Sequence, residues 1–170
     1  MTNFDYLKQE PRFKSFADVA IAAERIIHID IASSVINCRR AMEFAIKWMY
    51  SVDKSLEKPY QDTLISLMST EEFHLLVEES LWQRMDLIRK IGNRAAHAGK
   101  KISMDEAKLC LQNLFIFMDF VSHCYTDNYV ERKYDDSLLL NQKEIVEVPT
   151  ISDDDVSLQS LIAENKTLKD

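Results

Sequence analysis

The chain has 170 residues and a mass of 19.8 kDa, which suits one domain with a substantial hydrophobic core. It contains three prolines and two glycines, too few for the turns of a many-stranded β fold. The glycines, Gly92 and Gly99, also cannot form a phosphate-binding loop or a dinucleotide fingerprint. The net charge of −7 is unevenly distributed, since residues 1–134 have a net charge of −1 and residues 135–170 of −6. The chain therefore has no overall positive electrostatic field that would attract nucleic acid.

The cysteine content and the hydropathy pattern indicate where the protein resides. Three cysteines, an odd number, lie in apolar helical patterns and predict buried, reduced thiols rather than a disulfide framework. No Cys/His spacing suggests zinc, so we expect no metal site. The chain begins without an apolar leader and contains no uncharged apolar run of membrane-spanning length. We therefore expect a cytoplasmic protein with no membrane contact.

Apolar residues at three- and four-residue spacing predict helices in the first half of the chain. The first covers residues 15–28 and the second, which is longer, residues 30–52. Two short helices are expected within residues 60–77. The second of these should begin at Ser69, with Glu72 at the capping-box position.

Two longer helices complete the predicted body. One covers residues 78–98 and is closed by Gly99 in a left-handed conformation. The other covers residues 103–125, where Ser103 and Glu106 form a second capping box. The sequence thus predicts an all-α bundle with two long antiparallel core helices.

The tail differs from the body in composition and pattern. We expect a helical bundle domain over residues 1–134 and a flexible acidic linker over residues 135–152. Residues 153–170 predict the start of a coiled-coil helix, with a seam formed by Leu158, Leu161, Asn165 and Leu168. The heptad pattern is still incomplete at Asp170, the last residue of the sequence. It is either a frayed tail or a helix that continues in a longer natural chain.

The segment 87–99 contains both glycines and the most unusual polar pattern. Arg89, Asn93 and His97 lie at i, i+4 and i+8, so they form a polar row on one helix face. Gly92, in the middle of this helix, costs about 1 kcal/mol relative to Ala. Such a cost indicates that another part of the chain approaches closely there.

A second anomaly is Arg39, which lies within the apolar stripe of the predicted helix 30–52, one turn before Glu43. A buried guanidinium must be paired. Arg39, Glu43, Asn93 and His97 could therefore form a polar clasp between two helices, without chemistry. The alternatives are an Arg/His site for phosphodiester chemistry, and a site that binds an anion or a partner chain.

These two segments resemble a known family. Arg39-Arg40-x-x-Glu43 on one helix, with Ile88-Arg89-Lys90-Ile91-Gly92-Asn93-Arg94-Ala95-Ala96-His97 on a later one, resembles HEPN-type helical domains. The resemblance is to the subgroup at the N-terminus of restriction (R) subunits of type I restriction-modification enzymes. It covers roughly residues 1–140 and implies a HEPN-like helical bundle.

The resemblance implies a catalytic pattern that this chain matches only in part. Nuclease members of the group use an Arg, four to six intervening residues, and a His. His97 matches the His and Asn93 the polar residue, but the Arg would fall on Gly92, Ile91 or Lys90. If a HEPN site exists here, it consists of Arg89, Asn93 and His97. The fold is therefore implied, and the nuclease activity is not.

The resemblance implies a non-catalytic accessory domain of an R subunit that acts in DNA restriction and defence against foreign DNA. ATP and Mg²⁺ would belong only to nuclease and motor domains downstream, so we expect no cofactor in this chain. The expected partners are other subunits of the restriction complex and DNA through that complex, with a second copy in a homodimer as an alternative partner. The alternatives are a metal-free HEPN ribonuclease and a stand-alone defence or toxin–antitoxin component.

Overall fold

The computed structural model describes residues 1–139, and all regular structure in that part is helical, which confirms the all-α prediction. No helix within those residues combines the length and the apolar character that a membrane span requires. The elements in chain order are two 3-10 turns, η1 (Asp5–Gln9) and η2 (Pro11–Phe13), then α1 (Lys14–Arg25), α2 (Ile31–Val52), α3 (Leu64–Met68), α4 (Glu71–Leu76), α5 (Glu79–Ala96) and α6 (Met104–Tyr125).

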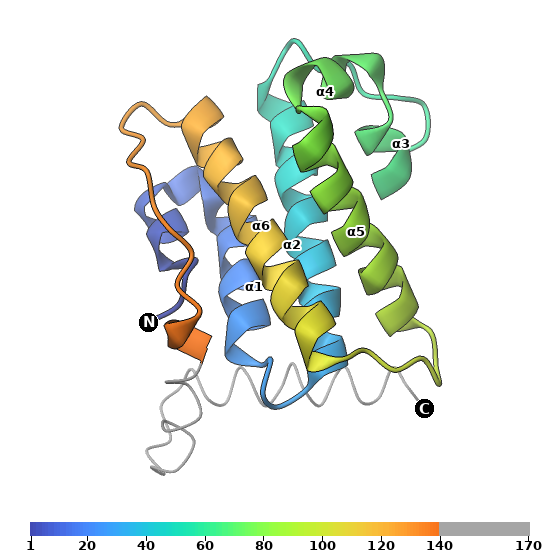
Figure 1. The fold of residues 1–170 in the computed structure, drawn as a ribbon. Helices are drawn as coiled ribbons and strands as arrows, with labels where there is room; N and C mark the ends of the chain where they lie inside the picture. The colour runs from blue at the N-terminus through green and yellow to red at the C-terminus, as the bar shows by residue number, and fades with distance from the viewer. Residues whose placement is uncertain (140–170) are drawn as a thin grey trace.

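The four long helices form an up-and-down bundle, and α3 and α4 lie together at one end of it (Figure 1). Helix α2 is central, because it packs against α1, α5 and α6. It runs antiparallel to α1 and α5, whereas α2 and α6, of 22 residues each, run in the same direction (Figure 1). Among the long helices, α2 is therefore antiparallel to the one that precedes it in the chain, α1, and to the one that follows it, α5.

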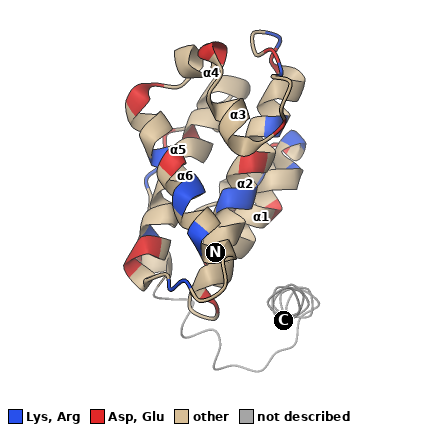
Figure 2. Ribbon diagram, turned by 90° about the vertical axis from the view of Figure 1, so that its right-hand side faces the viewer, with Lys and Arg blue, Asp and Glu red and all other residues tan. Residues whose placement is uncertain are grey.

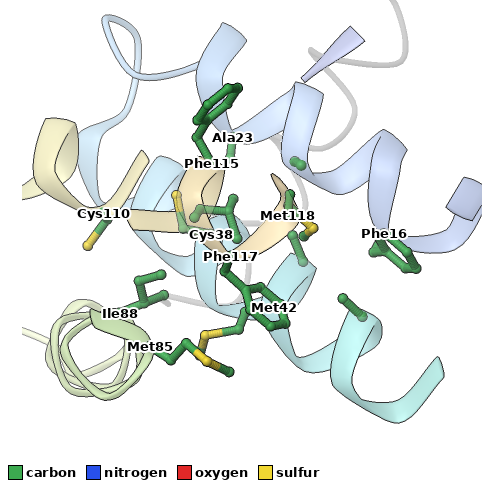
Figure 3. Close-up of a cluster of buried hydrophobic side chains, with 14 of the residues drawn as sticks. Phe16, Ala23, Cys38, Met42, Met85, Ile88, Cys110, Phe115, Phe117 and Met118 are labelled. Atoms are coloured by element: carbon green, nitrogen blue, oxygen red, sulfur yellow. The ribbon is translucent and has the colours of Figure 1, made fainter. Parts of the chain in front are cut away.

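The apolar stripes that predict the helices meet in one core. Met42 of α2, Met85 and Ile88 of α5 and Phe117 of α6 are all fully buried, and Figure 3 shows them converging where the three helices meet. Burying a side chain of this size contributes about 1.5–3 kcal/mol relative to leaving it exposed. The bundle is therefore held together by the apolar faces of its long helices, α1 included.

The three cysteines do not share one environment. Cys38 and Cys110 are buried and free, as predicted. Burial raises the pKa of the Cys38 thiol well above its ordinary value. Burial also raises the pKa of Cys110, to about 12. Cys124 is also free but exposed, so the prediction that it is buried is wrong. It lies in the last turn of α6, where the helix leaves the core.

Side-chain caps fix where most helices begin. Asp30 caps α2 by accepting a hydrogen bond from the backbone N–H of Ser33 at 3.1 Å. The capping box of Ser103 and Glu106 at the start of α6 is confirmed. The expected cap at Ser69 is wrong by one residue. Thr70 caps α4 instead, and its Oγ1 accepts from the N–H of Phe73 at 3.2 Å.

Gly92 lies where α5 crosses closest to α2. A Cβ atom at this position would lie 2.7 Å from both Cβ and Cδ of Arg39, closer than real Cβ atoms come to other atoms. The glycine therefore allows the stem of Arg39 to lie against the backbone of α5. Gly99 has a different role, since it adopts the left-handed conformation predicted for it, with φ +79°, beyond the end of α5.

After α6, residues 126–139 form a strap that returns along the bundle toward the N-terminal residues (Figure 1). The strap ends in a helical turn at residues 137–139. Leu139 is buried, and its carbonyl oxygen lies 2.7 Å from Nε2 of His28. The last five residues of the strap, which the sequence analysis assigns to an acidic linker, thus pack on the bundle. The remaining linker residues and the coiled-coil prediction for 153–170 lie outside the described residues.

A buried carboxylate joins the strap to the N-terminal segment. Glu24 of α1 is fully buried and accepts hydrogen bonds from the backbone N–H of Asn3, at 2.8 Å, and from the Asn3 side-chain amide. The same Asn3 amide exchanges two hydrogen bonds with the backbone of Asp135, at 2.8 and 3.1 Å. Burial raises the pKa of Glu24, although the bonds from Asn3 oppose that shift.

We expect Gly92→Ala to destabilise the protein although Ala is the better helix former. The added methyl must push α2 and α5 apart, and overpacking of this kind costs typically about 1–3 kcal/mol, more than the roughly 1 kcal/mol gained in helix propensity. Thermal unfolding should show a lower midpoint. Gly99→Asn is the matched control, because Asn tolerates a positive φ and no other atom lies near that position. A midpoint raised by Gly92→Ala would contradict the close packing.

The raised pKa of Glu24 predicts a pH-dependent contribution to stability. Between the ordinary value of 4.5 and its higher folded value, the folded chain binds more protons than the unfolded chain. The stability due to this group is complete below the ordinary value and is lost as pH rises through the folded one. Urea unfolding at several pH values should therefore show Glu24→Gln gaining on the wild type as pH rises from about 4.5. A difference independent of pH would contradict the assignment.

Candidate functional site

The candidate site begins with a row of charges on α2. Nη1 of Arg39 lies 3.4 Å from Oε2 of Glu43, and Nζ of Lys47 lies 3.0 Å from Oε1 of the same carboxylate. These residues are one helical turn apart, so Glu43 bridges two cations. The Arg39 side chain is 29% exposed, and its buried Nε finds no acceptor within residues 1–139. Arg39 is therefore held by packing on Gly92 and by a single carboxylate.

A second charged cluster lies on α5. Asp86, whose side chain is 12% exposed, pairs with Arg89 at 2.8 Å and with Lys90 at 2.9 Å. Burial alone would raise the pKa of Asp86, but the hydrogen bonds from Lys90 and Arg89 outweigh it and hold the pKa below its ordinary value. Figure 2 shows basic and acidic residues interleaved on α2 and α5. Arg89 thus pairs with Asp86 and not with Asn93 or His97.

The structure separates the remaining residues of the predicted site. Asn93 is half-buried and His97 is exposed, and within residues 1–139 neither side chain makes a hydrogen bond. The polar clasp expected from the sequence is therefore reduced to its two members on α2, Arg39 and Glu43. The physical reason is the end of α5 at Ala96. His97 is the C-cap, with φ −89° and ψ 130°, so it leaves the helical row that contains Arg89 and Asn93.

The direction of the Arg39 side chain adds to this separation. From its contact with Gly92, the chain extends toward Glu43, which lies further along α2. Because α2 and α5 are antiparallel (Figure 1), this direction leads toward the Arg89 turn of α5 and away from His97. The guanidinium of Arg39 and the imidazole of His97 therefore do not converge on a common point.

Two other basic residues of α5 bind α6. Arg94 pairs with Glu106, which is also the capping-box residue of α6, and Arg84 Nη1 donates to Oδ1 of the buried Asn113 at 2.9 Å. Their partners lie on another helix, so no local spacing reveals them. These pairs hold α5 against α6 and withdraw two cations from any binding surface.

The surface hollows lie away from the candidate site. Two shallow hollows on the second half of α2 have volumes of about 260 and 370 Å³. Lys47 and Ser51 line both, and neither includes Arg39, Asn93 or His97. In the part of the chain that the structure describes, no three His, Cys, Asp or Glu side chains gather as potential metal ligands. The expectation that the chain binds no metal or cofactor remains a prediction.

The hydrogen-bond network of Glu24, Asn3 and Asp135 is not predicted from the sequence. One signal was available, since Glu24 follows Ala20 and Ala23 and precedes Ile27 on the apolar side of its helix. An acidic residue in such a stripe must be hydrogen-bonded when buried. Its partner Asn3 is 21 residues away along the chain, and Asp135, which bonds Asn3, is 132 residues from Asn3, so neither gives a sequence signal.

Comparison with known proteins gives one match. A family model with the description "Domain of unknown function (DUF4145)" matches residues 21–142. This range begins within α1 and includes α2, α5, α6 and the strap. No curated protein and no solved structure matches the chain.

The positions of His97 and Glu43 predict effects of different size on stability. His97→Ala removes an exposed side chain and should change the thermal midpoint by less than about 2 °C. Glu43→Ala leaves Arg39 and Lys47 without their shared carboxylate and should lower the midpoint by about 2–4 °C. Glu43→Gln, which keeps an acceptor oxygen, is the matched control and should lie between the two. A larger loss for His97→Ala than for Glu43→Ala would restore the four-residue clasp.

Proposed function

Since the chain belongs to the DUF4145 family, whose description assigns no function, we propose one from its own geometry and its resemblance to HEPN-type domains. The proposed function is a non-catalytic interaction domain of the R subunit of a type I restriction enzyme. Within a cytoplasmic restriction complex it would bind other subunits and reach DNA only through them.

One observation supports the non-catalytic part of this proposal. The position that the HEPN pattern reserves for the catalytic Arg includes Gly92, and the stem of Arg39 fills the space beside it. The same Arg39 extends toward Glu43, not toward His97. A HEPN-type reaction needs Arg and His close to the same phosphodiester group. In this chain the nearest candidates for the two roles lie apart and in different environments.

The restriction context rests on the resemblance in segments 39–43 and 88–97. ATP and Mg²⁺ would be bound by nuclease and motor domains of the same R subunit, and this domain would contribute contacts between subunits. The main rival is a metal-free ribonuclease that uses Arg89, Asn93 and His97. The exposure of His97 is the feature that favours the rival, because an exposed imidazole is open to a substrate.

The two functions predict different results in an RNA cleavage assay. We expect the purified chain to leave a single-stranded RNA intact in EDTA, and His97→Ala and Arg89→Ala to behave like the wild type. General acid–base catalysis contributes about 10²–10⁴-fold in rate, so a ribonuclease that depends on His97 would be easily detected. Metal-free cleavage that both substitutions abolish would overturn the proposal.

A second measurement addresses the restriction context. Sequencing the gene beyond codon 170 should reveal nuclease and helicase regions in the same reading frame. In the full-length enzyme, His97→Ala should leave ATP-dependent DNA cleavage within about twofold of wild type, because an exposed residue outside a catalytic site contributes little. A gene that ends directly after codon 170 would instead favour a stand-alone defence component.

A further inference from the structure

The connection between α2 and α5 exposes apolar side chains that the core does not use. Eight large apolar side chains are highly exposed in the described part of the chain, and half of them lie in this short connection. We name residues 52–79, which include α3 and α4, the cap. Its exposed apolar side chains are Tyr60 and Leu75, 104% and 81% exposed, and to a lesser degree Val52 and Ile65. The end of α2, α3 and α4, which carry Val52, Ile65 and Leu75, lie at one end of the bundle (Figure 1). Large apolar side chains exposed together mark interaction surfaces.

The cap is also where the negative charge of the described chain gathers. Residues 53–79 contain seven carboxylates and two lysines, a balance of −5, whereas residues 1–134 as a whole balance at −1. One of the two lysines, Lys58, already pairs with Asp62. Four of the carboxylates, Glu57, Glu71, Glu72 and Glu78, are exposed and form no ion pair within residues 1–139. Figure 2 shows acidic residues on and next to α4.

The bundle holds the cap in place from below. Tyr50 of α2 donates a hydrogen bond to the carbonyl of Leu67 at 2.6 Å, and Trp82 of α5 donates to the carbonyl of Met68 at 2.7 Å. Helix α4 buries Phe73 completely, while Leu75, two residues later, points to solvent. The exposed side chains therefore stand on a fixed base. A rigid surface loses little conformational entropy when a partner binds.

We propose that the cap is the docking surface for a basic, amphipathic helical segment of a partner protein. This inference rests on the proposed function and names the partner chemistry of the interaction domain. An apolar stripe on the partner would cover Leu75 and Tyr60, and its Lys or Arg residues would face the unpaired carboxylates of α4 and its flanks. Nucleic acid does not fit this surface, because its phosphates would meet an excess of five negative charges.

A model peptide tests this chemistry directly. The probe is a fluorescein-labelled 16-residue helical peptide with Leu on one face and Lys on the other, titrated with the full chain in a fluorescence anisotropy measurement. Binding should weaken about tenfold for Leu75→Ser, since a buried leucine contributes at least the free energy of a tenfold change in Kd. Glu71→Gln/Glu72→Gln should also weaken it and should reduce its salt dependence.

Matched substitutions outside the cap provide the controls. Val130→Ser removes an apolar side chain that is 59% exposed, and Asp127→Asn/Glu131→Gln removes two exposed charges. Both belong to the strap and should leave peptide binding unchanged. Circular dichroism should show equal helix content for every variant, because all the altered side chains are exposed.

Three results would overturn the proposal. In the first, the cap variants and the strap controls bind the peptide equally. In the second, a labelled 20-mer DNA binds the wild type and loses binding in Glu71→Gln/Glu72→Gln. In the third, the wild type self-associates in sedimentation and Leu75→Ser does not, so that a second copy covers the cap. The proposed function fails independently, since metal-free RNA cleavage involves His97 and not the cap.

Discussion

The contact between Gly92 of α5 and Arg39 of α2 is the constraint on which the rest of the bundle depends. With no side chain at Gly92, the two helices approach until the aliphatic stem of Arg39 lies on the backbone of α5. At this spacing Met42, Met85 and Ile88 are fully buried between the helices, and interiors tolerate little change in such packing. On the polar edge of the same contact, the guanidinium of Arg39 pairs with Glu43 on its own helix. Core packing and the direction of the Arg39 side chain thus have one cause.

The sequence predicts the helices well because their signals are local. Each long helix follows from the spacing of its own apolar residues, and the capping box at Ser103 needs only residues 103–106. The errors arise where a neighbouring residue offers the same chemistry. Ser69 and Thr70 can both cap α4, and the fold selects Thr70, whose hydroxyl also lies 2.7 Å from that of Tyr50 on another helix. The end of α5 is similar, since the helical row continues in sequence through His97 while the chain turns away after Ala96.

The candidate site divides in the same way between local and distant information. The pairing of Arg39 with Glu43 follows from their separation by one turn, and Gly92 correctly indicates a close approach in the helix. The exclusion of Asn93 and His97 from that pair depends on the antiparallel register of α2 and α5, which one sequence cannot supply. Arg94 pairs with Glu106 and Arg84 with Asn113 only because α6 packs against α5, so these pairs could not be predicted from the sequence either. Local patterns therefore indicate which residues are unusual, and tertiary packing determines what they contact.

The strap has a mechanical consequence. Through Asn3 and Asp135, 132 residues apart, the chain closes into a loop whose junction is two hydrogen bonds, with the carbonyl of Leu139 held nearby by His28. A force applied to the chain beyond Leu139 would load the contact between Leu139 and His28 first and then this junction, before any long helix is strained. The bonds join a turn at Asn3 to the irregular backbone at Asp135 and are not part of any helix, so they can separate while α1, α2, α5 and α6 keep their packing. The strap would then lengthen by its own residues alone, and the core would act as a rigid anchor for whatever pulls on it.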